Sequence, residues 1–162
     1  MRKQWGVLAI AASVLLMLMA LPAGSSGRSQ VQLSKGQTLY VAVYSHIYWG
    51  KSARSYNLAC TLSVRNTDMS DPIRLMAVEY YDTNGKKLRT LLEKPTPIPP
   101  LGTKEFYIPE EDTLGGSGAN FIVRWEADRP ISAPLVEAVM IGVEAAQGIS
   151  FTSQGFVISE RK

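Results

Sequence analysis

The chain has 162 residues, with 17 Lys and Arg, 14 Asp and Glu, one histidine and one cysteine, and its formal net charge is +3. A single cysteine excludes a disulfide framework within the chain, and one histidine with one cysteine cannot form an ordinary structural zinc site. The basic residues are dispersed along the sequence, whereas a nucleic-acid surface needs them clustered on one face. We therefore expect no metal, no cofactor and no nucleic-acid partner.

The N-terminal segment has the order of a secretory signal peptide. Arg2 and Lys3 precede an uncharged apolar run at residues 7–23, and small residues follow it. We expect residues 1–25 to be removed on export. An uncleaved anchor at residues 7–23 is the alternative, because a membrane-spanning helix needs roughly 20 apolar residues. Either way we expect a periplasmic or extracellular protein that meets the membrane only through this segment, when it is retained.

The rest of the chain predicts one domain of short strands. Residues 26–36 are polar and are expected to form a linker, or alternatively a first edge segment, and residues 37–162 are expected to form the domain. Residues 57–67 alternate strictly, which is typical of a half-buried strand, and their apolar face consists of Leu58, Cys60, Leu62 and Val64. This position predicts that Cys60 is a buried small hydrophobic residue rather than a reactive thiol.

Turn signals separate the later strands. Asn84 and Gly85 predict a tight hairpin, since both residues tolerate positive φ. Four prolines between residues 95 and 100 predict an edge or connecting segment, because proline cannot donate to a strand ladder. Residues 135–146 are predicted as a strand, since β-branched residues and Gly142 disfavour a helix. About seven to nine antiparallel strands predict an all-β immunoglobulin-like sandwich, with a small barrel as the alternative.

Six sequence blocks carry a resemblance to a known family. In chain order they are YSHIYWG, LSVRNTD, YYDTNG, GGSGANFIVRW, EAVMIG and GISF. They are similar to the hallmark blocks of an uncharacterised bacterial family of exported proteins, catalogued as a domain of unknown function. The resemblance covers residues 34–158, and one departure is Ala42, where the family pattern often has proline. It implies a secreted or envelope-exposed protein and carries over no catalytic residues.

The stretch YVAVYSHIYWG, residues 40–50, is the main candidate for binding. Read as one strand, it presents an aromatic face with polar tips, made of Tyr40, Tyr44, His46 and Tyr48. The opposite face, which includes Trp49, is expected in the core. Rings of this kind bury area and also offer hydrogen bonds, so the aromatic face can contact a ligand or a partner. Ordinary packing with each hydroxyl bonded locally is the alternative.

The loop GGSGAN, residues 115–120, is the second candidate surface, with Ser117 and Asn120 as its contact residues. It does not match a nucleophile elbow, because the last glycine is replaced and a strand follows. It does not match a phosphate loop either, since it lacks Gly-Lys-Ser/Thr and a following helix. A structural turn that uses the freedom of glycine is the alternative.

Glu137 lies within the apolar segment PLVEAVMIG and is expected to be partly buried. A buried carboxylate needs a partner, and Arg124 is the first structural candidate for a buried ion pair, with Arg65 as the alternative. His46 is the functional candidate. A hydrolase would need a serine, His46 and a carboxylate to meet, and Ser45 cannot serve because neighbours on a strand point to opposite faces.

We therefore expect a noncatalytic exported β-sandwich that binds another component of the cell envelope, either a protein or a glycan. One alternative is a structural or assembly module that pairs through an edge strand, and another is a hydrolase that uses His46 with a distant carboxylate. An exposed aromatic patch would favour the first, an open strand edge the second, and a concave site with converging acid and base groups the third.

Overall fold

The computed structural model describes residues 32–144 and 147–161 of the chain. The expected leader, residues 1–25, lies outside these residues. Every regular element in the described ranges is a β-strand, and all the strand pairs are antiparallel, which confirms the predicted all-β antiparallel class. The first strand begins at Leu33, inside the stretch that was expected to be a linker.

No helix long and apolar enough to span a membrane occurs in the described part of the chain.

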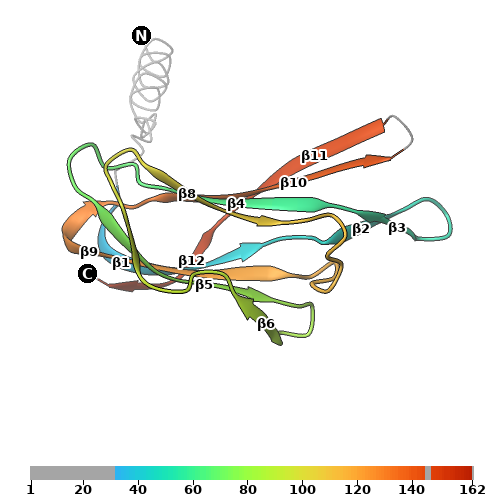
Figure 1. Cartoon of the computed structure of the whole chain (residues 1–162), viewed down its shortest axis with the longest axis horizontal. Helices are drawn as coiled ribbons and strands as arrows, with labels where there is room; N and C mark the ends of the chain where they lie inside the picture. The colour runs from blue at the N-terminus through green and yellow to red at the C-terminus, as the bar shows by residue number, and fades with distance from the viewer. Residues whose placement is uncertain (1–31, 145–146, 162) are drawn as a thin grey trace, which may run out of the picture. The chain divides into compact units, whose positions relative to one another are not determined.

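The strands form two larger sheets and one separate hairpin (Figure 1). The six-stranded sheet contains, in spatial order, β12 (Phe156–Arg161), β1 (Leu33–Ala42), β9 (Asn120–Ser132), β5 (Ile73–Tyr81) and β6 (Lys87–Thr90), with β7 (Thr96–Ile98) also paired to β5. The four-stranded sheet has the order β11 (Gln147–Gln154), β10 (Leu135–Glu144), β4 (Ala59–Arg65) and β8 (Thr103–Ile108). The hairpin consists of β2 (His46–Trp49) and β3 (Arg54–Asn57).

The two sheets face each other across one hydrophobic core. Alternate residues of each central strand point inward, as the period of a β-strand requires. The six-stranded sheet contributes the largest buried side chains, Tyr80, Phe121 and Trp125, each at most 1% exposed. Leu62 and Met140 meet them from the four-stranded sheet. The predicted apolar face of residues 58–64 is fully buried, which confirms that alternation and the burial of Cys60.

The hairpin predicted at Asn84 and Gly85 is confirmed between β5 and β6. Gly85 has φ of 77°, a conformation that costs glycine little. The Asp82 carboxylate accepts hydrogen bonds from the backbone N–H groups of Asn84 and Lys86, each at 2.9 Å, and so closes the turn. The strand predicted at residues 135–146 is also confirmed, as β10.

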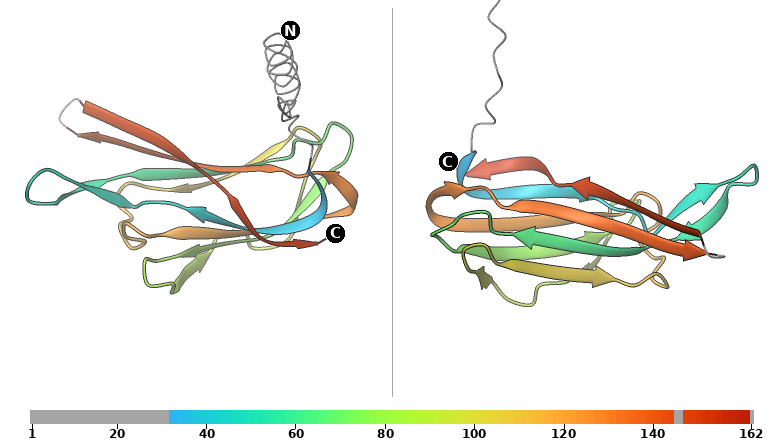
Figure 2. Two further views of the ribbon diagram at one scale, coloured as in Figure 1. Left: turned by 180° about the vertical axis from the view of Figure 1, so that it is seen from behind. Right: turned by 90° about the horizontal axis from the view of Figure 1, so that it is seen from above.

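The last part of the chain belongs to both sheets, first as β11 and then as β12. β11 pairs with β10 in the four-stranded sheet, and after Gly155 the chain continues as β12, which pairs with β1 in the six-stranded sheet. Figure 2 shows this passage from one layer to the other. A Cβ atom at residue 155 would lie 3.0 Å from Leu39 Cδ2 and 3.4 Å from Val136 Cβ, so the crossing has little room for a side chain.

Two hairpins project at the same end of the domain. β2 and β3 pair with each other, from His46 with Asn57 to Trp49 with Arg54. The hairpin of β10 and β11 extends beside them (Figures 1 and 2). The β2–β3 hairpin is tied to the body where Ser45 N–H donates to Gly116 O and Leu58 N–H donates to Ser45 O.

The turn that follows β4 is organised by the Asp68 carboxylate. Backbone N–H groups of Ser70, Asp71 and Ser132 donate to it, at distances of 2.9 to 3.2 Å. These hydrogen bonds hold the pKa of the Asp68 carboxyl below its ordinary value of 3.8. The turn therefore depends on the ionised form of this side chain.

We predict that Gly155→Val destabilises the domain, because the added methyl groups must displace Leu39 or Val136 where the strand changes sheets. The expected loss in the free energy of unfolding is about 1–3 kcal/mol. Gly148→Ala is the control, since the nearest atom to a Cβ there is 3.9 Å away, and it should change the free energy by no more than about 0.5 kcal/mol. Urea unfolding followed by fluorescence measures both, and equal effects would contradict the tight crossing.

We predict that Asp68 contributes to the stability of the fold near neutral pH and ceases to do so in acid. Its folded pKa lies below its unfolded value, so the contribution is complete above about pH 4 and is lost as the pH falls through the folded pKa. The difference in melting temperature between wild type and Asp68→Asn should shrink towards about pH 3. Asp128→Asn is the control, because that carboxylate is 94% exposed. A difference for Asp68→Asn that does not vary with pH would rule out this role.

Candidate functional site

The predicted aromatic face of residues 40–48 does not form one surface. β1 ends at Ala42 and β2 begins at His46, so the stretch crosses from the six-stranded sheet into the projecting hairpin. Tyr40 pairs with Phe156 and Ile122 on the outward side of the six-stranded sheet. Tyr44 instead packs edge-on against Phe151 of β11, with ring centroids 5.7 Å apart.

His46 and Tyr48 remain neighbours on β2. His46 Nε2 lies 3.1 Å from the Tyr48 hydroxyl, and the two rings meet edge-on. Ser45 is 2% exposed, and its hydroxyl lies 2.9 Å from that of the buried Tyr80. As the sequence predicts, Ser45 and His46 point to different sides of the chain.

The GGSGAN loop has a structural role. The backbone oxygen atom of Gly115 accepts hydrogen bonds from both the N–H and the hydroxyl of Thr83, and Gly118 N–H donates to that hydroxyl. A Cβ atom at Gly115 would lie 2.0 Å from the hydroxyl oxygen of Tyr80. Asn120, at 9% exposure, is buried in β9, and Ser117 is half-buried in the loop.

The structure does not pair Glu137 with Arg124, so the expected buried ion pair is wrong. Glu137 lies in β10 opposite Ser63 and Gln154, whereas Arg124 lies in β9 of the other sheet. Both residues alternate with buried neighbours, which places them on the outward faces of their sheets. Glu137 is half-buried rather than buried, so its carboxylate needs no ion-pair partner.

A cleft lies between the two projecting hairpins, and it is the strongest candidate site. Its volume is about 470 Å³, within the range of ligand-binding pockets. β2 and β3 supply one wall and the start of β11 supplies the other, through Ile47, Trp49, Arg54, Tyr56, Gln147, Gly148 and Ile149.

The cleft is held in shape by three contacts. The Tyr56 hydroxyl donates to the Gln147 carbonyl oxygen at 3.1 Å, which joins the two hairpins. The Arg54 guanidinium lies 4.3 Å from the centroid of the Trp49 ring, a cation–π contact that orients both side chains. Gly142 allows the close approach, since a Cβ atom there would lie 2.4 Å from Tyr56 Cε1.

The walls of the cleft expose apolar surface that a folded domain ordinarily buries. Trp49 is 46% exposed and Ile149 is 40% exposed, and the neighbouring Tyr48 is 59% exposed. Trp49 was expected in the core, and that expectation is wrong, because the hairpin carries it past the end of the six-stranded sheet. Trp and Tyr are the side chains that most often dominate binding surfaces.

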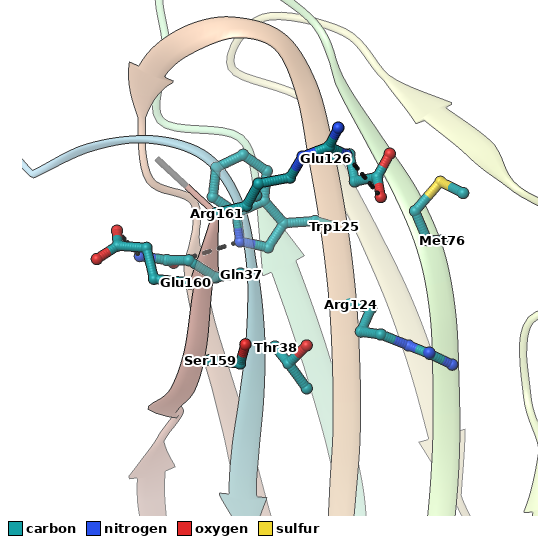
Figure 3. A pocket seen from close by; sticks show the side chains of 10 residues that line it. Gln37, Thr38, Met76, Arg124, Trp125, Glu126, Ser159, Glu160 and Arg161 are labelled. Atoms are coloured by element: carbon teal, nitrogen blue, oxygen red, sulfur yellow. Dashed lines mark hydrogen bonds and ion pairs between the residues drawn. The ribbon is translucent and has the colours of Figure 1, made fainter.

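A second hollow lies over β12, β1, β9 and β5 and has a volume of about 400 Å³ (Figure 3). Its polar side chains mostly engage one another. Gln37 accepts a hydrogen bond from Trp125 Nε1 and donates to Glu160, and Arg161 pairs with Glu126. Figure 3 shows Arg124 pointing away from the others. We therefore assign the candidate site to the cleft between the hairpins.

Catalytic and metal-binding arrangements are not apparent near the cleft. In residues 32–144 and 147–161, no group of three or more His, Cys, Asp or Glu side chains gathers where a metal ion could be held. Burial raises the pKa of the Cys60 thiol to about 12, so it is protonated at neutral pH. Among the lining residues whose side chains the structure describes, Arg54 is the charged one.

The fold and the site define an antiparallel all-β domain whose exposed aromatic cleft is built from two hairpins. The chain belongs to the family described as "Protein of unknown function (DUF3124)", whose model matches residues 36–158. No curated protein matches the chain.

Among solved structures, the chain is similar to one titled "Crystal Structure of Thermotoga maritima 1070". The alignment covers 74% of this chain and 92% of that chain, with 10% sequence identity and a TM-score of 0.45. Likeness at that level supports no statement about function.

We predict that Cys60 does not react with thiol reagents while the domain is folded, because the side chain is 3% exposed and its thiolate is disfavoured. Labelling with a chromogenic disulfide at neutral pH should be negligible in buffer and complete in denaturant. Thr61→Cys, on the half-buried outward side of the same strand, should react faster in the native protein. Rapid native labelling of Cys60 would contradict its place in the core.

Proposed function

We propose that this protein is a noncatalytic, exported, immunoglobulin-like β-sandwich that binds another component of the cell envelope in the cleft between its two projecting hairpins. The observation that carries the proposal is the exposure of Trp49 and Ile149 on the two walls of one concave surface. Exposed aromatic and aliphatic side chains that cluster in this way mark interaction sites more often than isolated ones do.

The composition of the cleft favours a partner that presents apolar surface together with hydrogen-bonding groups. Trp49 and Tyr56 offer ring surface, and the backbone of Gly148 allows close approach. Arg54, stacked on Trp49, adds a cation at the rim. An extended segment of an envelope protein and a glycan both have this chemistry. The signal-like order of residues 1–25 supports a place outside the cytoplasm.

We do not propose a hydrolase, because the groups that it needs are apart in the described residues. His46 contacts Tyr48 on the hairpin, and the Ser45 hydroxyl is enclosed with Tyr80 in the core. Glu137 lies opposite Ser63 and Gln154 within the four-stranded sheet. General base catalysis requires the base to lie within hydrogen-bond reach of the nucleophile, directly or through one water molecule.

We predict that a photo-crosslinking amino acid at position 49, in place of Trp49, captures the partner in intact cells. Trp49 is nearly half exposed, so its replacement should leave the fold intact. Tyr107 of β8 is the matched control, because it is 63% exposed on a strand that does not line the cleft. The expected result is a discrete crosslinked species from position 49 that position 107 does not give.

The variant Ile149→Glu, made in the position-49 crosslinking background, tests whether the opposite wall takes part. It introduces a charge into the apolar wall of the cleft and should abolish the adduct. If the adduct survives this change, or if positions 49 and 107 give the same species, the cleft is not the binding site.

A further inference from the structure

The outer strands of the two sheets differ in how they are protected against pairing with other chains. β8 carries Lys104 and Glu105, β6 carries Lys87 and Arg89, and β7 contains Pro97. Charges and prolines on an edge strand are the usual devices that prevent intermolecular strand pairing. Between residues 147 and 159, which span β11 and most of β12, the chain has no charged residue and no proline.

Within this unprotected stretch, β11 is the regular half. The pairing of β12 with β1 has a register shift between Thr38 and Leu39, and such bulges twist an edge away from partners. The pairing of β11 with β10 runs without a shift from Gln147 to Gln154. In the described part of the chain, no strand pairs with the other side of β11.

The hydrogen bonds between β10 and β11 show which backbone groups of β11 are left open. Gly155 N–H donates to Val136 O at 2.9 Å, in the same register that pairs β10 with β11. Because successive residues of a strand direct their backbone groups to alternate sides, the odd-numbered residues of β11 face β10. The open N–H and C=O groups are therefore those of Gly148, Ser150, Thr152 and Gln154.

We propose that two copies of this chain associate by antiparallel pairing of β11 with β11 of the second copy, across a twofold axis at Phe151. With that axis, Ser150 of each copy lies opposite Thr152 of the other, and Gly148 lies opposite Gln154. This register uses all four open residues of both strands. It joins the two four-stranded sheets into one continuous sheet.

The partner strand is β11 of a second copy because the sequence of β11 can pair with itself. A twofold axis brings each residue near its own counterpart, so a charged edge would repel itself, as Lys87 and Arg89 of β6 would. β11 has no charge, and the proposed register sets Ser opposite Thr and Phe opposite Phe. Both kinds of cross-strand pair are stabilising. The association does not depend on what the cleft binds.

The register is tested with the double variant Ser150→Cys/Thr152→Cys in the full-length chain. Directly opposite residues of a hydrogen-bonded antiparallel pair have Cα atoms about 5.5 Å apart, a separation that a disulfide spans. Mild oxidation should give a covalent dimer on a non-reducing gel. The matched control, Thr103→Cys/Glu105→Cys on the protected edge of β8, should remain monomeric, and buried Cys60 should add no background.

The edge itself is tested with two neighbouring proline variants. Thr152→Pro removes an N–H that faces the second copy, so it should abolish the dimer and leave the monomer folded. Ser153→Pro removes an N–H that faces β10, opposite Ala138, and should destabilise the fold instead. Thr152→Lys keeps every backbone hydrogen bond and should also abolish the dimer, through repulsion between the two lysines across the axis.

The proposal is overturned if the chain is monomeric at all concentrations, or if the cysteine pairs on β11 and β8 crosslink equally. It is also overturned if the Thr152 variants remain dimeric, or if the cysteines on β11 crosslink to a different protein and not to a second copy. If the crosslinked adduct at position 49 is absent but the dimer forms, the proposed function of the cleft is contradicted and the β11 dimer is not.

Discussion

The two sheets are joined where the chain crosses between them at Gly155, a position with little room for a side chain. At Gly155 the chain leaves β11 of the four-stranded sheet and enters β12 of the six-stranded sheet, and the Gly155 N–H donates to Val136 O at the point of crossing. A strand that changes sheets couples the two layers through the backbone, in addition to the hydrophobic contact between them. Since β10 and β1 are both paired with this strand, displacement of either sheet would break hydrogen bonds in the other.

The path of the chain determines where the cleft and the open strand edge lie. β11 is the outermost strand of its sheet, so it exposes one row of backbone groups, while its first residues form a wall of the cleft. The hairpin of β2 and β3 forms the opposite wall, because the chain must travel from β1 in one sheet to β4 in the other. Instead of a short loop, it makes that connection with two extra strands, which extend Trp49 beyond the core and pack Tyr56 against its edge.

Much of the fold could be predicted because it depends on local patterns. The alternation at residues 58–64 and the hairpin at Asn84 and Gly85 are properties of short segments, and both are confirmed. The role of Trp49 could not be predicted in this way. An ideal strand would place Trp49 on the same side as Val41 and Val43, in the core. The six-stranded sheet ends before Trp49, so the side chain is exposed.

For a related reason, the sequence indicated only one wall of the candidate site. The aromatic stretch drew attention to residues 40–50, but the opposite wall comes from residues 147–149, about a hundred positions later. Strand pairing across such a separation is set by the packing of the whole domain rather than by local propensity. The expected pairing of Glu137 with Arg124 failed because alternation shows which side of a strand a residue occupies, without showing to which sheet the strand belongs.

The two ends of the described domain lie together, and this decides how the domain can be displayed. Gly36 near the start of β1 is paired with Arg161 at the end of β12, whereas both hairpins project at the opposite end (Figures 1 and 2). The path from Gly36 to Trp49 spans at most about 45 Å of extended chain. A fusion partner or a solid support joined at either end of the domain is therefore attached at the end opposite the aromatic cleft, where it leaves the cleft uncovered.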